Sequence, residues 1–280
     1  FLPDTPTCRA EIAQYYQSAS RVDQGIGRLI EILKETGKWE DTLFLFIADH
    51  GIAMPGAKTT LYEGGMRSPC LVRNPYLKKR GIATDAMVSW VDLAPTILQF
   101  ANVLDDKGKL TPSTAQSLGI AKIKGEQNGR GLTPGKFHGR SFLSVLDKEK
   151  TIGWDQVNAS HTFHEITMYY PMRVVRERRY KLIWNIAHGL PYPFASDLWA
   201  APTWQAQWKQ GMSAPYGAKT VRNYIHRPAF ELYDLQEDPH EGNNLANSSK
   251  HVELLARLKK KLKAFQEQTN DPWVMKWRYE

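Results

Sequence analysis

An apolar run that ends abruptly in polar residues lies in the first quarter of the chain. Residues 43–48 are uniformly apolar, and Asp49, His50 and Gly51 follow them directly. Such a run predicts a strand at 42–48 that is buried on both faces of a parallel sheet. Open α/β sheets carry their functional groups at the carboxyl ends of such strands. We therefore expect Asp49 and His50 to lie at a functional site.

A long helix is predicted ahead of this strand. Thr5 and Pro6 offer an N-cap and a first-turn proline, and the apolar residues after them recur at helical spacing, forming a stripe that one face of a sheet could cover. Beyond residue 51 the pattern predicts strands at 69–73 and 86–90 and a helix at 92–101. This alternation of helices and strands is typical of an α/β domain.

The rest of the chain has a different pattern. Residues 102–136 are rich in Gly, Lys, Ser, Thr and Gln with little periodicity, which predicts a surface loop or an insertion. Apolar residues on both sides of a charged turn at 176–179 predict a β-hairpin, and FELYDL at 230–235 predicts a further strand. Residues 250–266 predict a helix with one apolar face.

These elements predict an α/β fold in two domains. Residues 1–150 would form a mixed sheet flanked by helices, with 102–136 as its loop or insertion. Residues 151–280 would form a small antiparallel sheet with a packed helix.

The composition permits a packed globular protein. Of the 280 residues, 42% are hydrophobic, and no apolar run approaches the roughly 18–20 residues of a membrane helix. The first residues lack the basic and apolar regions of a signal peptide, and the chain begins with Phe1, so we expect a processed or incomplete product. Cys8 and Cys70 are too few for a disulfide framework or a metal cluster.

The charge is a weaker indication of function. A formal net charge of +8 and a pI near 9.3 favour anionic partners such as nucleic acid, sulfated glycans or acidic membranes. The positive residues are spread along the chain in short clusters, so a solvated basic surface explains them equally well. Charge alone does not choose between these interpretations.

Asp49, His50 and Lys58 are the first candidates for chemistry. A carboxylate suits Ca²⁺, Mg²⁺ or Mn²⁺ and a neutral imidazole suits Mn²⁺ or Zn²⁺, so the adjacent pair could bind a divalent cation if other ligands complete the site. Lys58 follows in a glycine-rich loop and could bind an anion beside the cation. The alternative is a capped strand end followed by a solvated lysine.

Several motifs resemble the sulfatases of the alkaline phosphatase superfamily, in the same order and at similar spacing. They are a helix with Tyr16, Arg21, Asp23 and Gly27, the strand ending ADHG at 48–51, the spaced Lys58, LYEGGMRSP at 61–69 and ELYDLQEDPHEGNNLA at 231–246. Further stretches are similar to one branch of that family, the sulfamidases: FLPDTP at the start, SHTFHEITMYYPMR at 160–173, PYPF at 191–194 and NDPW at 270–273. The resemblance covers nearly the whole chain outside 102–136.

This resemblance implies a sulfatase or alkaline-phosphatase-like fold and a role for each of the three candidates. Asp49 and His50 match the family's second pair of calcium ligands. His50 stands where sulfamidases usually have Asn, so Mn²⁺ and Mg²⁺ are alternatives to Ca²⁺. Lys58 matches the basic residue that holds a sulfate oxygen, which is usually Arg in sulfamidases.

The family's nucleophile is implied to lie outside this chain. Sulfatases use a formylglycine made from Cys or Ser in a C/S-x-P-x-R motif, and neither Cys8 nor Cys70 lies in one. The first pair of metal-binding aspartates belongs to the family's N-terminal half. The resemblance therefore implies the C-terminal part of a sulfatase, in which residues 1–150 belong to the catalytic domain and 151–280 form the C-terminal subdomain. Such a part is expected to be inactive by itself.

Four residues are candidates for substrate contact. His161, His164, Glu165 and Arg173 lie in a polar and aromatic stretch that neither a helical nor a strand period explains. Glu165 could bind the glucosamine nitrogen or hydroxyls, and Arg173 a sulfate or carboxylate. The alternative is a buried structural network.

The implied activity is hydrolysis of sulfate from the N-sulfoglucosamine of heparin or heparan sulfate. An O-sulfatase, or a phosphonate or phosphate ester hydrolase of the same superfamily, is the nearest alternative, and a non-catalytic polyanion-binding protein is the alternative from another class. The expected partner is a sulfated glycosaminoglycan or its fragments, without nucleic acid or a membrane span. The family also implies an exported, periplasmic or lysosomal enzyme, and a homodimer is a further expectation.

Overall fold

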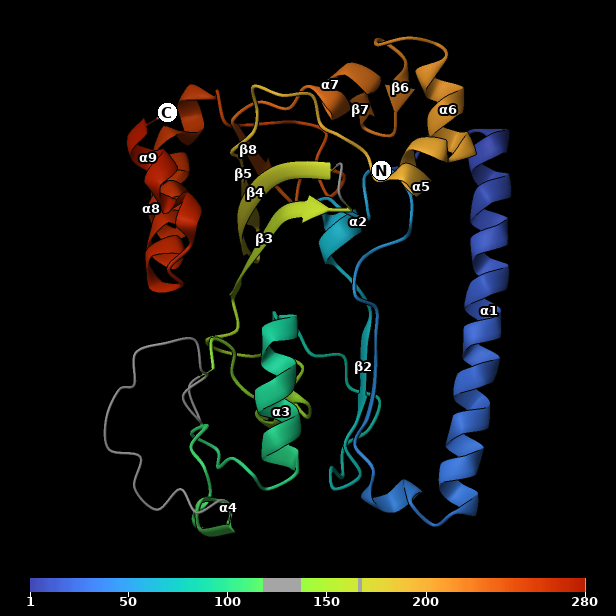
Figure 1. Ribbon diagram of the computed structural model, residues 1–280, viewed down its shortest axis with the longest axis vertical. Helices are drawn as coiled ribbons and strands as arrows, with labels where there is room; N and C mark the ends of the chain where they lie inside the picture. Colours follow the sequence, from blue (N-terminus) through green and yellow to red (C-terminus); the bar gives the residue numbers. More distant parts are fainter. Residues whose placement is uncertain (118–136, 166–167, 280) are drawn as a thin grey trace. The chain divides into compact units, whose positions relative to one another are not determined.

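The computed structural model describes residues 1–117, 137–165 and 168–279, which form a mixed α/β structure (Figure 1). Its helices and strands are α1 Pro6–Glu35, β1 Phe44–Ile47, α2 Glu63–Met66, β2 Cys70–Arg73, α3 Leu93–Phe100, α4 Pro112–Ser117, β3 Gln156–His164, β4 Met168–Glu177, β5 Tyr180–Asn185, α5 Ser196–Ala200, α6 Pro202–Trp208, β6 Pro215–Tyr216, β7 Lys219–Thr220, α7 Val221–Ile225, β8 Phe230–Asp234, α8 Val252–Gln268 and α9 Lys276–Tyr279. Short 3₁₀ helices are Trp39–Asp41, Trp90–Asp92, Leu143–Val145, Ser249–His251 and Pro272–Met275.

Two compact units divide the chain. One combines Phe1–Asp41, Leu45–Leu71 and Asn158–Glu280, and the other combines Thr42–Phe44 and Val72–Val157. The first unit therefore contains residues from both sides of the boundary expected at residue 150. The assignment of 1–150 and 151–280 to two parts of a sulfatase stays a prediction.

Helix α1 forms where the apolar spacing predicts it. Thr5 caps its first turn, because its hydroxyl accepts a hydrogen bond from the Cys8 backbone N–H at 3.2 Å. The helix ends shortly before Gly37, whose φ of +68° is one that glycine adopts without strain. Tyr16 and Val22 of the apolar stripe are exposed. Among the described residues, no sheet face covers this part of the stripe as we expected.

Strands β1 and β2 confirm the predictions at 42–48 and 69–73. They form a two-stranded sheet. All four residues of β1 are only partly buried, so the expectation of a strand buried on both faces is wrong for the described structure. A sheet of two strands leaves much of each strand's surface uncovered.

The strand predicted at 86–90 is wrong. Met87 donates a backbone hydrogen bond to the Trp154 carbonyl at 3.0 Å, but the described residues build no ladder from it. The Asp92 carboxylate turns the chain instead, because it accepts the Ser89 N–H at 2.9 Å and caps the 3₁₀ turn that leads into α3. Helix α3 confirms the helix predicted at 92–101.

The predicted loop at 102–136 has local structure in its first part. Leu104 and Leu110 pair in an isolated bridge, and α4 follows. Residues 118–136 lie outside the described residues, so the prediction of a loop or insertion is untested there.

The C-terminal sheet confirms the predicted hairpin and the strand at 230–235. Its strands lie in the order β3-β4-β5-β8, with β4 and β5 antiparallel and β5 and β8 antiparallel. Leu182 on β5 lies opposite Leu232 on β8. Helix α8 packs beside this sheet, where Leu258 and Leu262 are buried in a cluster with those two leucines (Figure 1). The small antiparallel sheet with a packed helix is therefore present.

A group of buried charges, the Lys181 cluster, joins the start of α2 and the residues just before it to the sheet. The Lys181 side chain is 0% exposed, and its ammonium lies 2.8 Å from a carboxylate oxygen of Glu63 and 2.8 Å from one of Glu241. The ammonium also donates to the Leu61 carbonyl at 3.1 Å, and Arg176 donates to Glu63 at 3.0 Å. Because a buried charge is tolerated only with partners, this cluster holds the segment in one place.

A third carboxylate, that of Glu231 on β8, is also buried. It accepts hydrogen bonds from the Tyr62 hydroxyl at 2.9 Å and from the Asn185 amide at 2.7 Å. Burial alone raises the pKa of Glu231, but Lys219 and Arg227 outweigh burial and lower this pKa below its ordinary value. The Tyr62–Glu231 hydrogen bond thus joins the LYEGG motif to the ELYDL motif.

The protein should lose stability in acid because of Glu63. Burial raises the pKa of Glu63, but Lys181 and Arg176 outweigh burial and lower it from 4.5 to about 2. A carboxyl group with a lowered folded-state pKa adds stability above its unfolded pKa, here roughly 3 kcal/mol, which is lost as the pH falls from about 4.5 towards 2. Urea unfolding between about pH 6 and pH 3 measures this loss.

Glu63→Gln should lower the free energy of unfolding near neutral pH and flatten its decline in acid. Glu149→Gln, at an exposed position outside the helices and strands, is the matched control and should change neither quantity. An acid decline of the same slope in Glu63→Gln and the unaltered protein would contradict the assignment to Glu63.

Candidate active site

The turn after β1 brings Asp49 and His50 together. The Asp49 side chain is 89% exposed, and its Oδ2 lies 3.7 Å from His50 Nε2. The other ring nitrogen, Nδ1, lies 2.7 Å from the Gly51 carbonyl oxygen. Since a carbonyl oxygen only accepts, Nδ1 is the donor of this contact, and Nε2 is the ring nitrogen that lies on the side of the carboxylate.

This donor pair fits a divalent cation in part. An imidazole nitrogen and a carboxylate oxygen are both common ligands, and here they face the same space. Within the described ranges, however, no group of three or more His, Cys, Asp and Glu side chains could hold a metal ion. The pair is therefore part of a ligand set, and a complete site requires further donors.

Close backbone packing holds the turn that carries the donor pair. The Gly51 N–H donates to the Gly65 carbonyl at 3.2 Å. A Cβ on Gly51 would lie 1.8 Å from the Gly64 carbonyl oxygen, so a larger residue would push the two segments apart. The LYEGG segment, which the Lys181 cluster holds, thereby supports the donor pair.

Lys58 lies in the loop between β1 and α2 and is nearly buried. Its side chain is 14% exposed, and its ammonium donates to Asp197 Oδ2, on α5, at 2.7 Å. Burial raises the pKa of Asp197, but Lys58 outweighs burial and lowers that pKa. Lys58 is therefore not the freely solvated lysine of the alternative interpretation.

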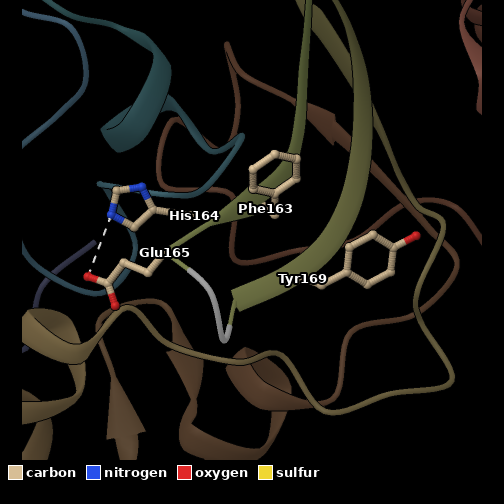
Figure 2. Close-up of a pocket in the computed structure, with 4 residues that line it drawn as sticks. All are labelled: Phe163, His164, Glu165 and Tyr169. Carbon is tan, nitrogen blue, oxygen red and sulfur yellow. Dashed lines mark ion pairs between the residues drawn. The ribbon is translucent and has the colours of Figure 1, made fainter.

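His164 and Glu165 lie at a wide-open surface cavity of about 650 Å³ at the end of β3, and Phe163 and Tyr169 complete its lining (Figure 2). The His164 imidazole and the Glu165 carboxylate are 3.9 Å apart. Phe163 and Tyr169 are largely exposed aromatic side chains. Exposed aromatic rings beside an imidazole and a carboxylate offer apolar and polar contacts to a small molecule.

His161 and Arg173 belong to a buried network. The Arg173 guanidinium makes a two-pronged ion pair with Asp271, one hydrogen bond of which is 2.9 Å, and lies 4.8 Å from the Trp273 ring. It also donates to the His161 carbonyl oxygen at 3.1 Å. Burial lowers the pKa of His161. The contacts of Arg173 favour the structural alternative for this residue, and its contact with substrate stays untested.

Helix α5 brings two predicted parts of the site to one place. Its first residue, Ser196, contacts Glu165, and its second, Asp197, contacts Lys58. The sequence did not indicate Ser196 or Asp197 as functional residues. A five-residue helix is too short for a periodic pattern, and the two contacts span 31 and 139 positions. The PYPF stretch just before α5 is the available signal.

Two family models match separate parts of the chain. Residues 2–103 match the model described as Sulfatase, and residues 212–268 match the model described as N-sulphoglucosamine sulphohydrolase, C-terminal. The chain belongs to the sulfatase family. Use of a metal ion and a formylglycine is a general feature of that family.

Curated relatives match this sulfatase over most of its length. Human N-sulphoglucosamine sulphohydrolase is 38% identical over 277 residues, which cover 98% of this chain and 51% of the relative. An ulvan-active sulfatase of Formosa agariphila is 25% identical over 267 residues, which cover 94% of this chain and 39% of the relative. The sulfatase chain thus spans about half the length, or less, of these relatives.

Solved structures confirm the fold class. A protein solved in complex with its substrate, D-glucosamine-2-N,6-O-disulfate, matches with a TM-score of 0.57 at 22% identity, covering 90% of this sulfatase and 39% of that chain. A 2-O GAG sulfatase matches with a TM-score of 0.62 at 18% identity, covering 95% and 44%. These likenesses show the sulfatase fold alone. In the described part of the chain, no helix is long and apolar enough to cross a bilayer.

The buried role of Arg173 predicts a large loss of stability in Arg173→Met. The variant would leave Asp271 buried without its charged partner, which costs about 3–5 kcal/mol in comparable pairs. Urea unfolding measures the change. Arg9→Ala breaks an exposed pair with Asp4 and should leave the midpoint unchanged. An equally stable Arg173→Met protein would contradict the structural role.

Proposed function

We propose that this sulfatase chain belongs to an enzyme that releases sulfate from the N-sulfoglucosamine of heparin or heparan sulfate. The observation that carries the proposal is the 38% identity to human N-sulphoglucosamine sulphohydrolase over 98% of the chain. The match of residues 212–268 to the C-terminal model of that family supports it. The first observation concerns almost the whole sequence rather than one motif.

The donor pair and Lys58 would have electrostatic roles in this reaction. Asp49 and His50 would hold a divalent cation, Ca²⁺ first and Mn²⁺ or Mg²⁺ as alternatives, together with ligands from outside the described residues. Lys58 would stabilise negative charge on the sulfuryl oxygens. The cation and the formylglycine of the family supply a nucleophile for attack on sulfur. These 280 residues contain no C/S-x-P-x-R motif, so catalysis requires a nucleophile from elsewhere.

The cavity at the end of β3 would contact the sugar. Glu165 can accept hydrogen bonds from the glucosamine nitrogen or hydroxyls, and His164 lies beside it. The exposed rings of Phe163 and Tyr169 offer apolar surface for a sugar ring. His161 and Arg173 would support this wall of the site from the buried network. Export to the periplasm or lysosome and a homodimer stay predictions.

Two alternatives have observations in their favour. His50 in the donor pair favours an O-sulfatase, or a phosphonate or phosphate ester hydrolase, because sulfamidases usually carry Asn at that position. The net charge of +8 is compatible with a polyanion-binding protein without catalysis. A C/S-x-P-x-R motif in the complete protein would remove the binding-only alternative.

The substrate class can be tested on the complete enzyme that contains this chain. Incubation with N-sulfated and with 6-O-sulfated glucosamine should release inorganic sulfate mainly from the N-sulfated sugar, as measured by ion chromatography. Release from the 6-O-sulfated sugar alone would favour the O-sulfatase alternative. Absence of release from both sugars, with retained binding to heparin, would favour the binding protein.

Lys58→Ala in the complete enzyme should lower turnover by about a hundredfold or more, the range observed when one preorganised charge-stabilising donor is removed. Steady-state sulfate release at saturating substrate measures the change. Lys78→Ala, at an exposed position, is the matched control and should retain full turnover. Unchanged turnover in Lys58→Ala would remove Lys58 from the site.

A further inference from the structure

The ammonium of Lys58 is held at one side by Asp197. The two charged atoms are 2.7 Å apart, and the lysine side chain is 14% exposed, against 46% for the aspartate. A hydrogen bond between two charged groups at this distance is among the stronger polar contacts in proteins. An ammonium has three N–H donors, and among the described residues Asp197 is the partner seen for one of them. The remaining donors are available to an anion.

The backbone next to Lys58 is held by a second residue from the same distant segment. Thr59 has a φ of +65°, which is unfavourable for a β-branched residue. The Tyr192 hydroxyl donates to the Thr59 carbonyl at 2.8 Å and lies 2.9 Å from the Thr59 hydroxyl. Tyr192 is buried, and the Arg227 guanidinium lies 3.5 Å from the centre of its ring. The strained peptide therefore depends on a rigidly placed partner.

Glu165 holds the other end of this arrangement. Its carboxylate accepts hydrogen bonds from the Ser196 N–H at 3.2 Å and from the Ser196 hydroxyl at 3.3 Å. Ser196 immediately precedes Asp197 at the start of α5, so a shift of one residue moves the other. A continuous series of polar contacts thus runs from the end of β3 through α5 to Lys58.

We propose that Asp197 is a positioning residue that fixes the Lys58 ammonium, and that Glu165 acts on Lys58 through α5. The neutral alternative is that Lys58 and Asp197 pair only as a surface salt bridge, without consequence for the loop. The low exposure of Lys58 and the separate anchoring of Thr59 by Tyr192 argue against it, because exposed pairs lack such support. The value of the arrangement for sulfate chemistry rests on the proposed function, in which Lys58 binds a sulfuryl oxygen.

The proposal can be tested on the complete enzyme that contains this chain, by the rate at which an amine-acetylating reagent modifies Lys58, measured by peptide mass spectrometry. Asp197→Asn keeps the shape of the side chain and removes its charge, and it should raise the Lys58 rate about fivefold. Asp197→Glu restores a carboxylate and should return the rate towards that of the unaltered protein. The rate at the buried Lys181 should stay low in both variants, because the fold is intact.

The link through α5 can be tested with a double-mutant cycle. Glu165→Gln should raise the Lys58 rate by a smaller factor, and the double variant Glu165→Gln/Asp197→Asn should be no faster than Asp197→Asn. Glu267→Gln, which breaks a distant pair with Lys263, is the control and should leave the Lys58 rate unchanged. An unchanged rate in Asp197→Asn would overturn the positioning role, and independent, multiplicative effects would overturn the link.

Addition of inorganic sulfate separates this proposal from the proposed function. If Lys58 binds a sulfuryl group, sulfate should slow its modification in the unaltered complete enzyme. An Lys58 rate that sulfate does not change, together with the fivefold rise in Asp197→Asn, would support the positioning role and contradict the role of Lys58 in sulfate binding.

Discussion

The burial of the Lys181 ammonium between two carboxylates is the constraint on which much of this structure depends. Its side chain is 0% exposed, and both carboxylate contacts are 2.8 Å long. A positive charge removed from water in this way is tolerated only where its partners are correctly placed. One partner, Glu63, comes from the LYEGG segment and the other, Glu241, from the DPHEG turn near the end of the chain. The cluster therefore specifies which early segment lies against the C-terminal sheet.

The placement of the donor pair follows from that constraint. Gly65 accepts a hydrogen bond from Gly51, and the close approach of the two backbones leaves no room for a side chain at residue 51. Asp49 and His50, which immediately precede Gly51, are consequently presented at an exposed turn whose position is set from the buried side. The buried charge cluster fixes the LYEGG segment, and the glycine contacts of that segment fix the exposed turn that carries the donor pair.

Most of the regular elements were predictable from local pattern. Helix α1, the hairpin of β4 and β5, strand β8 and helix α8 each have a period or a turn signal that backbone geometry alone explains. The strand expected at 86–90 failed because the Asp92 side chain captures the Ser89 N–H and turns the chain. The full burial expected for β1 failed because burial depends on neighbouring elements, which an apolar run does not specify.

The sequence by itself determined the kind of chemistry: a carboxylate and an imidazole after a strand, a lysine in a glycine-rich loop, and a set of motifs whose order matches the sulfatases. Spacing carries that information because adjacent residues at a strand end must lie close together. Only the tertiary structure decided which charges meet over long separations. It paired Arg173 with Asp271 and buried Lys181 between Glu63 and Glu241. It also brought Glu165 and Lys58 into contact with the first two residues of α5. Such pairings depend on where folding brings distant segments, and no local period records them.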